Sequence, residues 1–106
     1  MTPLETLKAA RQLISDPAKW TQGEFARDAT GYAVRPINDD CVCFCALGAI
    51  AHVDKTHKLR GSAAEKYLSK LCEKSRNISI GIFNDTHTHA EVLALFDAAI
   101  AELEGV

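Results

Sequence analysis

Three of the four cysteines in this 106-residue chain alternate with apolar residues in the segment Cys41-Val-Cys-Phe-Cys45. The segment runs directly into a helical pattern of small and apolar residues, so Cys45 falls in the first turn of the expected helix. A thiol there lies near the positive end of the helix dipole, which lowers its pKa and favours the reactive thiolate. Chemistry on this chain is therefore expected first at Cys45.

A nucleophilic cysteine also needs a base and a group that orients the base. Either His87 or His89 is the candidate base. Asn84 or Asp85 would orient it, which completes the Cys/His/Asn type of arrangement found in acyl-transfer enzymes. A cysteine whose histidines are distant in sequence is a weak signal, so the preferred interpretation is that Cys45 fills a small site between closely packed helices. A small cysteine hydrolase or transferase is the alternative.

The same region also contains the residue types that bind zinc. Cys41-x-Cys43-x-Cys45 would supply thiolates and His87-x-His89 would supply imidazoles. Structural zinc sites, however, space their cysteines by two or more residues so that both can turn inward. No metal and no cofactor is therefore predicted.

Charge and length narrow the classes of function. The chain has 12 Lys and Arg against 14 Asp and Glu, which gives a net charge of −2 without a basic stripe, so no nucleic-acid partner is expected. No segment approaches the roughly 20 apolar residues of a membrane span, and the amphipathic, charged N-terminus does not resemble a signal peptide. These features predict a single globular domain, residues 1–106, in the cytoplasm, with reduced cysteines.

Helix starts are the strongest structural signal in the sequence. A hydroxyl residue is followed three places later by glutamate, the pattern of a capping box, at Thr2/Glu5, Ser62/Glu65 and Thr88/Glu91. Each pair precedes an apolar periodicity. Helices are predicted at residues 3–15, 62–74 and 88–104, with a fourth, buried helix at residues 43–53. Gly48 in the fourth helix indicates close approach of another backbone, which we expect to be that of the C-terminal helix.

The remaining segments predict a small amount of extended structure. Residues 25–28 and 32–35 flank a turn from Asp28 to Gly31, which favours a two-stranded hairpin. Residues 78–82 alternate at period two and predict a short strand or extended segment. The expected architecture is mainly α, a small four-helix-type bundle with a minor β-hairpin.

Three short motifs occur in a fixed order along the chain: Trp20-x-Gln22-Gly23, Cys45-Ala-Leu-Gly-Ala49, and Asn84-Asp85 followed by Thr88-x-x-Glu91-Val92. In these motifs the chain resembles a family of small uncharacterised bacterial and phage proteins. Phe83 stands where that family is expected to have tryptophan, and Cys41 and Cys43 lie outside its pattern. The resemblance implies a fold and a shared surface but no reaction. By analogy, a phage-type protein of this size would inhibit a host defence or regulatory protein.

The absence of a complete catalytic set, a cofactor loop and a basic face favours a non-enzymatic protein that binds another protein. The predicted binding residues are Trp20, Gln22, Asn84, Asp85 and Thr86. Asp85 would bind a basic group of the partner, although the Asn84–Thr86 segment is also suited to turn and capping interactions.

Two features of the chain stay open at this level. A homodimer is possible, because the apolar stripe of the last helix would be buried either within the monomer or across a two-fold interface. His52 and His57 receive no role.

Overall fold

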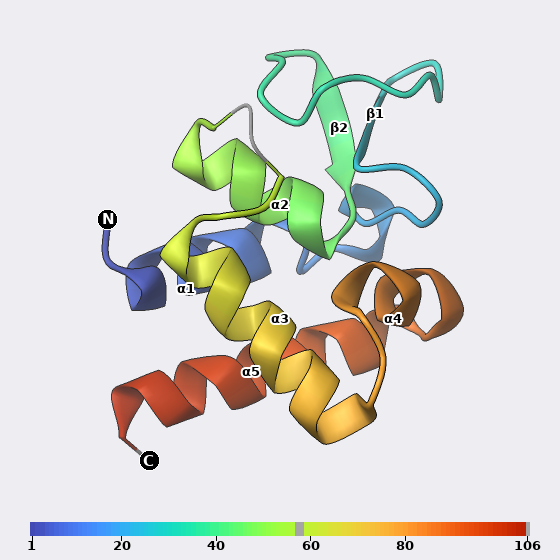
Figure 1. The fold of residues 1–106 in the computed structure, drawn as a ribbon. Helices are drawn as coiled ribbons and strands as arrows, with labels where there is room; N and C mark the ends of the chain where they lie inside the picture. The colour runs from blue at the N-terminus through green and yellow to red at the C-terminus, as the bar shows by residue number, and fades with distance from the viewer. Residues whose placement is uncertain (57–58, 106) are drawn as a thin grey trace.

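The computed structural model describes residues 1–56 and 59–105, which form five α-helices and one two-stranded antiparallel sheet (Figure 1). In order, the elements are α1 (Pro3–Leu13), the short 3-10 helix η1 (Pro17–Lys19), β1 (Ala26–Asp28), β2 (Cys41–Phe44), α2 (Ala46–Asp54), α3 (Ala63–Arg76), α4 (Ile80–Thr86) and α5 (His89–Glu104). The predicted mainly α architecture with a minor hairpin is confirmed, although the helices number five. His57 lies outside the described residues.

Helix capping accounts for where the long helices begin. Thr2 and Thr88 each form a complete capping box, with Glu5 and Glu91 respectively. The Ser62 side chain likewise accepts a hydrogen bond from the third residue of α3. The carboxylate of that residue, Glu65, accepts instead from the backbone N–H of Gly61 at 2.7 Å, so the third box is incomplete.

The core lies between α1 and the helices that pack around it. α1 packs against α2 and α5, and α3 crosses α5 (Figure 1). The apolar stripe of α5 is buried within the chain itself, at Val92, Leu95, Phe96 and Ala99. The expectation that α2 packs mainly on the C-terminal helix is wrong, because α2 packs mainly on α1. None of the helices in the described ranges has both the length and the apolarity needed to cross a membrane.

The predicted close approach at Gly48 is confirmed, with a different neighbour. A Cβ added at Gly48 would lie 1.8 Å from the carbonyl oxygen of Phe25, far inside van der Waals contact. The same carbonyl oxygen accepts a hydrogen bond from the N–H of Cys45 at 3.1 Å. The backbone that leads into β1 is therefore pressed against the first turn of α2.

The hairpin is formed by different segments from those predicted. β1 pairs with β2, with Ala26 opposite Phe44 and Arg27 opposite Cys43. Residues 32–35, the predicted partner, form no strand and meet the other edge of β1 through an isolated bridge between Arg27 and Ala33. The turn itself is present, since the N–H of Gly31 donates to the carbonyl of Asp28 at 3.0 Å. This strand partner is absent from the prediction because residues 43 and 44, its second half, are predicted as the start of the helix that follows.

Two further predictions are corrected. The helix expected from residue 43 begins only at Ala46, and Cys45 is its N-cap rather than a residue of its first turn. The strand expected at residues 78–82 is the start of α4, whose N-cap Ser79 accepts from the N–H of Ile82 at 3.4 Å. Ile80 and Phe83 are both buried, which is the spacing of a helix face rather than of a strand.

Candidate functional site

The three motif segments meet at the N-terminus of α2, with the side chain of Asn84 between them. Asn84 is 1% exposed. Its Oδ1 accepts from the indole N–H of Trp20 at 2.8 Å and from the N–H of Ala46, the first residue of α2, at 3.0 Å. Its Nδ2 donates to the carbonyl of Thr21 at 3.0 Å and to Asp85 Oδ1 at 3.1 Å. A side-chain amide has two N–H donors and two acceptor positions, and all four of Asn84 are used in these contacts. Asn84 therefore has a structural role in the fold.

Hydrogen bonds also join the turn that begins at Trp20 to the C-terminal end of α4. Gln22 Nε2 donates to the carbonyl oxygens of Asn84 and His87, both at 3.0 Å. The N–H of Gly23 donates to Asp85 Oδ1 at 2.9 Å. The structure therefore brings the predicted residues Trp20, Gln22, Asn84 and Asp85 together, but through hydrogen bonds to one another. Gln22 and Asp85 are exposed, whereas Asn84 is buried and Trp20 is half-buried.

Cys45 caps α2 through its sulfur. Sγ accepts from the N–H of Gly48 at 3.3 Å, and the residue is 6% exposed. Burial raises the pKa of the Cys45 thiol to about 11, and the opposing hydrogen bonds from the N–H groups of Gly48 and Leu47 are smaller effects. The shift is opposite in direction to the one expected from the helix dipole alone.

Both candidate bases are engaged elsewhere. His87 Nδ1 lies 3.1 Å from the carbonyl oxygen of Phe83, and its ring stacks on the Phe83 ring at a centroid distance of 4.2 Å. His89 Nε2 donates to the carbonyl oxygen of Ile14 at 2.6 Å, which links the start of α5 to the end of α1. Within residues 1–56 and 59–105, no hydrogen bond joins either histidine to Cys45. The cysteine and the residues expected to orient a base are thus close together, while the histidines bind other groups.

Cys41 and His52 also have structural partners. The Cys41 thiol donates to the carbonyl oxygen of Arg35 at 3.1 Å. His52 Nδ1 lies 2.5 Å from the carbonyl oxygen of Pro36, and its ring lies 4.7 Å from that of Phe44. Among the described residues, no group of three His, Cys, Asp or Glu side chains is arranged to hold a metal ion.

A small cavity of about 190 Å³ opens beside Cys45. Its apolar part includes Cys45, Leu47 and Ile80, and the charged side chains at it are those of Glu24, Arg60 and Asp85. The cavity is the size of one amino-acid side chain or a very small ligand. The cavity lies against α4, through Ile80 and Asp85, and among the described residues neither His87 nor His89 lines it.

Residues 1–102 match the sequence model of a family of unknown function, DUF6197. The chain belongs to this family. Searches among curated proteins and among solved structures gave no match. Membership in DUF6197 agrees with the resemblance to an uncharacterised family, and the matched region contains all three motifs that converge on α2.

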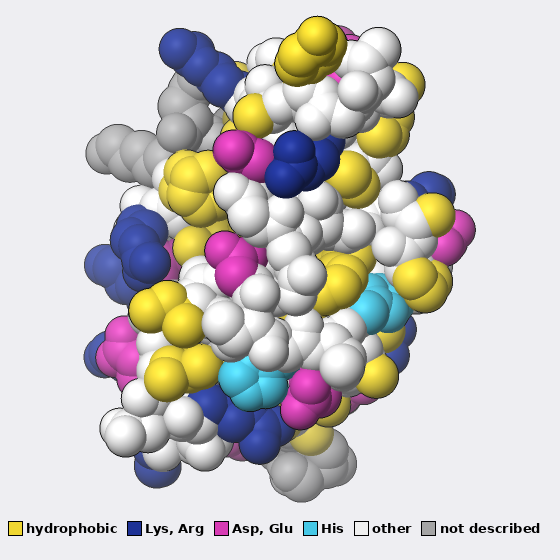
Figure 2. All heavy atoms as spheres, turned by 90° about the vertical axis from the view of Figure 1, so that its right-hand side faces the viewer, with side chains coloured by type: hydrophobic (Ala, Val, Ile, Leu, Met, Phe, Trp, Pro, Cys, Tyr) yellow, Lys and Arg dark blue, Asp and Glu magenta, His cyan; other side chains and the backbone are white. Residues whose placement is uncertain are grey.

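One exposed surface of this DUF6197 protein lies directly next to the convergent motifs. Ile82 is 57% exposed, and Asp85 and Thr86, three and four residues further along α4, are exposed as well. Residues at this spacing are neighbours on one helix face. We call Ile82, Asp85 and Thr86 the α4 surface. The view onto the side of the molecule that carries α4 shows hydrophobic side chains scattered among charged and polar ones (Figure 2).

The α4 surface contains two of the predicted binding residues, Asp85 and Thr86. Ile82 is not among the predicted binding residues because residues 78–82 are predicted to form a short strand or extended segment. The available signal was Ser79, a good N-cap residue, followed by apolar residues at helical spacing.

Proposed function

We propose that this DUF6197 protein is a non-enzymatic, cytoplasmic protein that acts by binding another protein through the α4 surface. The observation that carries the proposal is the exposure of Ile82, at 57%, on a helix whose other large apolar residues, Ile80 and Phe83, are buried. Exposed apolar side chains bordered by polar groups are typical of the surfaces that proteins use for association.

Asp85 gives this surface a charge preference. Its Oδ1 accepts from Gly23 and Asn84, and Oδ2 receives no hydrogen bond from the other described residues. At the adjacent cavity Glu24 adds a second carboxylate, while the cation there, Arg60, lies 3.9 Å from the carboxylate of Glu65. A basic side chain of the partner would bind at Asp85, with its aliphatic part against Ile82.

The finer form of the proposal concerns source and role. The protein is of bacterial or phage origin and inhibits a host defence or regulatory protein. This part rests on the resemblance to a family of small uncharacterised bacterial and phage proteins and on no feature of the α4 surface.

Cysteine hydrolase or transferase chemistry at Cys45 is the second candidate, because Cys45 lines the small cavity together with Asp85. A nucleophile of this kind needs a thiolate near neutral pH. The raised pKa of Cys45 and the separate partners of His87 and His89 favour the binding function.

The test compares proteins captured from a bacterial lysate on the immobilised wild-type protein and on two variants. Ile82→Ala removes the exposed apolar side chain of the α4 surface, and Val42→Ala removes one of similar type, 44% exposed, on β2. A partner of the α4 surface should bind Ile82→Ala at least about tenfold more weakly. It should bind Val42→Ala as tightly as the wild type.

Asp85→Asn then isolates the charge. Asparagine keeps a side-chain oxygen that can accept from Gly23, so the turn is retained while the carboxylate is lost. Weaker binding with a reduced salt dependence would support the basic partner group. Partners that bind all three variants like the wild type would count against the α4 surface.

A further inference from the structure

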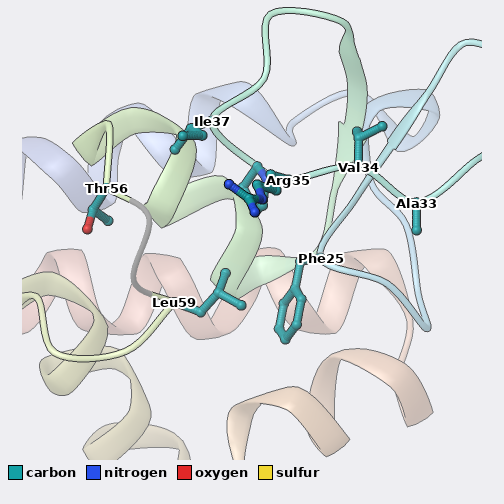
Figure 3. A pocket seen from close by; sticks show the side chains of 8 residues that line it. Phe25, Ala33, Val34, Arg35, Ile37, Thr56 and Leu59 are labelled. Atoms are coloured by element: carbon teal, nitrogen blue, oxygen red, sulfur yellow. The ribbon is translucent and has the colours of Figure 1, made fainter.

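A second pocket among the described residues does not include the α4 surface and is lined by residues 33–37 together with Phe25, Thr56 and Leu59 (Figure 3). Its volume is about 550 Å³, within the range of about 300–1,000 Å³ that is usual for small-molecule sites. The apolar lining residues are Phe25, Ala33, Val34, Pro36, Ile37 and Leu59. Among the described lining residues, Thr56 and Arg35 are the polar ones, and none carries a carboxylate.

Arg35 is the one charged residue among the described residues that line this pocket. In Figure 3 its guanidinium lies among the lining side chains, with Ile37, Leu59 and Phe25 around it. Within the described residues, the Arg35 side chain forms no ion pair and no hydrogen bond. A guanidinium presents parallel N–H donors whose spacing matches the two oxygens of a carboxylate. An anionic group bound here would therefore meet a free cationic fork at an apolar wall.

The backbone that carries Arg35 is held in place before any ligand binds. The Arg35 carbonyl oxygen accepts from the N–H of Asn38 at 3.0 Å and from the Cys41 thiol at 3.1 Å. The next carbonyl, that of Pro36, is bound by His52, and the proline ring fixes its own φ. Because these groups are already ordered, a ligand would not have to order this segment on binding.

We propose that this pocket binds a small monocarboxylate with an aromatic or branched apolar body. The carboxylate pairs with the guanidinium of Arg35, and the apolar body packs against Phe25, Val34 and Leu59. The site is distinct from the α4 surface and adds a small-molecule ligand to the proposed protein partner. The charge of Arg35 sets the requirement for an anion, and the apolar wall sets the requirement for a hydrophobic body.

The test uses 3-phenylpropionate as the probe and its amide, 3-phenylpropanamide, as a neutral control of the same shape. Both are titrated into the ¹⁵N-labelled 106-residue protein and followed by two-dimensional NMR. The carboxylate should shift the amide resonances of Val34, Arg35, Ile37 and Leu59 and bind at least about tenfold more tightly than the amide. Equal affinities, no shifts, or shifts confined to other residues would overturn the proposal.

Variants assign the charge effect to one side chain. Arg35→Gln should abolish the preference for the carboxylate over the amide, and Arg35→Lys should keep part of it because the charge remains without the planar fork. Arg76→Gln changes the net charge equally, at a residue that does not line the pocket, and should leave the affinity unchanged. If Arg76→Gln lowered the affinity for 3-phenylpropionate as much as Arg35→Gln does, the effect would come from net charge, and the proposed site would be wrong.

A peptide is the competing source of the same chemistry. Gly-Gly-Phe, with a free C-terminal carboxylate, presents a similar apolar anion on a chain. Binding of this peptide more tightly than 3-phenylpropionate would overturn the assignment to a small molecule and identify a peptide C-terminus as the ligand.

Discussion

The protonation state of Cys45 yields a quantitative prediction about reactivity. Burial raises the pKa of this thiol from the ordinary value of 9.0 to about 11. At pH 7 the thiolate fraction then falls from roughly one in 100 to roughly one in 10,000. Alkylation of Cys45 should therefore be about a hundredfold slower in the folded protein than in the unfolded chain from ionisation alone. Its 6% exposure slows the reaction further.

The assay is iodoacetamide labelling, read at each cysteine by fragment mass spectrometry, in native and in denaturing buffer. Cys43, half-buried on β2, is the internal control in the same segment. Native Cys45 labelled at neutral pH as fast as in denaturant would refute the reasoning. If that fast reaction were also lost in His87→Ala or His89→Ala, the hydrolase or transferase alternative would replace the binding function.

The same pKa shift predicts a loss of stability at high pH. The pKa is higher in the folded state, so folding favours the neutral thiol. The resulting stabilisation is fully present below pH 9.0 and is lost as the pH rises to about 11. Two pKa units correspond to about 3 kcal/mol. Denaturant unfolding between these pH values should show a smaller loss of stability for Cys45→Ala than for the wild type, whereas parallel losses in the two proteins would contradict the assignment.

Three further predictions concern the fold. Gly48→Ala should lower the free energy of unfolding by at least about 2 kcal/mol, because its Cβ would lie 1.8 Å from the carbonyl oxygen of Phe25. The gain in helix propensity, about 1 kcal/mol, cannot offset this clash. Denaturant unfolding measures the change, and an unchanged free energy of unfolding would contradict the prediction. Asn84→Ala should lower the free energy of unfolding by about 3–5 kcal/mol in the same assay, because it removes four hydrogen bonds and leaves buried polar groups without partners. A loss under about 1 kcal/mol would show that these contacts are dispensable. Hydrogen bonds from the backbone and side chain of Thr88 lower the pKa of the Glu91 carboxyl. The stabilisation by Glu91 is therefore present above the ordinary pKa of 4.5 and is lost as the pH falls through the lowered pKa. Thermal melts should show that acid lowers the stability of Glu91→Gln less than that of the wild type.

Helix starts were predictable because their signals are local. A capping box needs only four consecutive residues, and both complete boxes, at Thr2 and Thr88, lie where the sequence placed them. The start of α4 carries a weaker signal. Ser79 caps it, but Ile82 stands where a capping box has glutamate, and the alternation of isoleucines from residue 78 to 82 imitates a strand. Five residues are too few for the two periods to be told apart.

The partners of the polar motif residues were out of reach of sequence reasoning for a different reason. Asn84 binds the side chain of Trp20, 64 residues earlier, and the backbone of Ala46, 38 residues earlier. No local pattern distinguishes an asparagine that caps its own turn from one that bridges three distant segments. Side-chain types alone also leave open whether a polar cluster faces a partner or is satisfied internally.

The geometry at α2 changes what the motifs mean. The hydrogen bonds of three motif residues, Trp20, Gln22 and Asn84, join these residues to one another and to the N-terminus of α2. These motif residues therefore have a structural role in the fold. A residue whose donors and acceptors are all used internally has little left to offer a partner. The function must then be sought at side chains that the fold does not explain. Among the described residues, two such side chains are Ile82, an exposed apolar residue, and Arg35, a cation with no partner there.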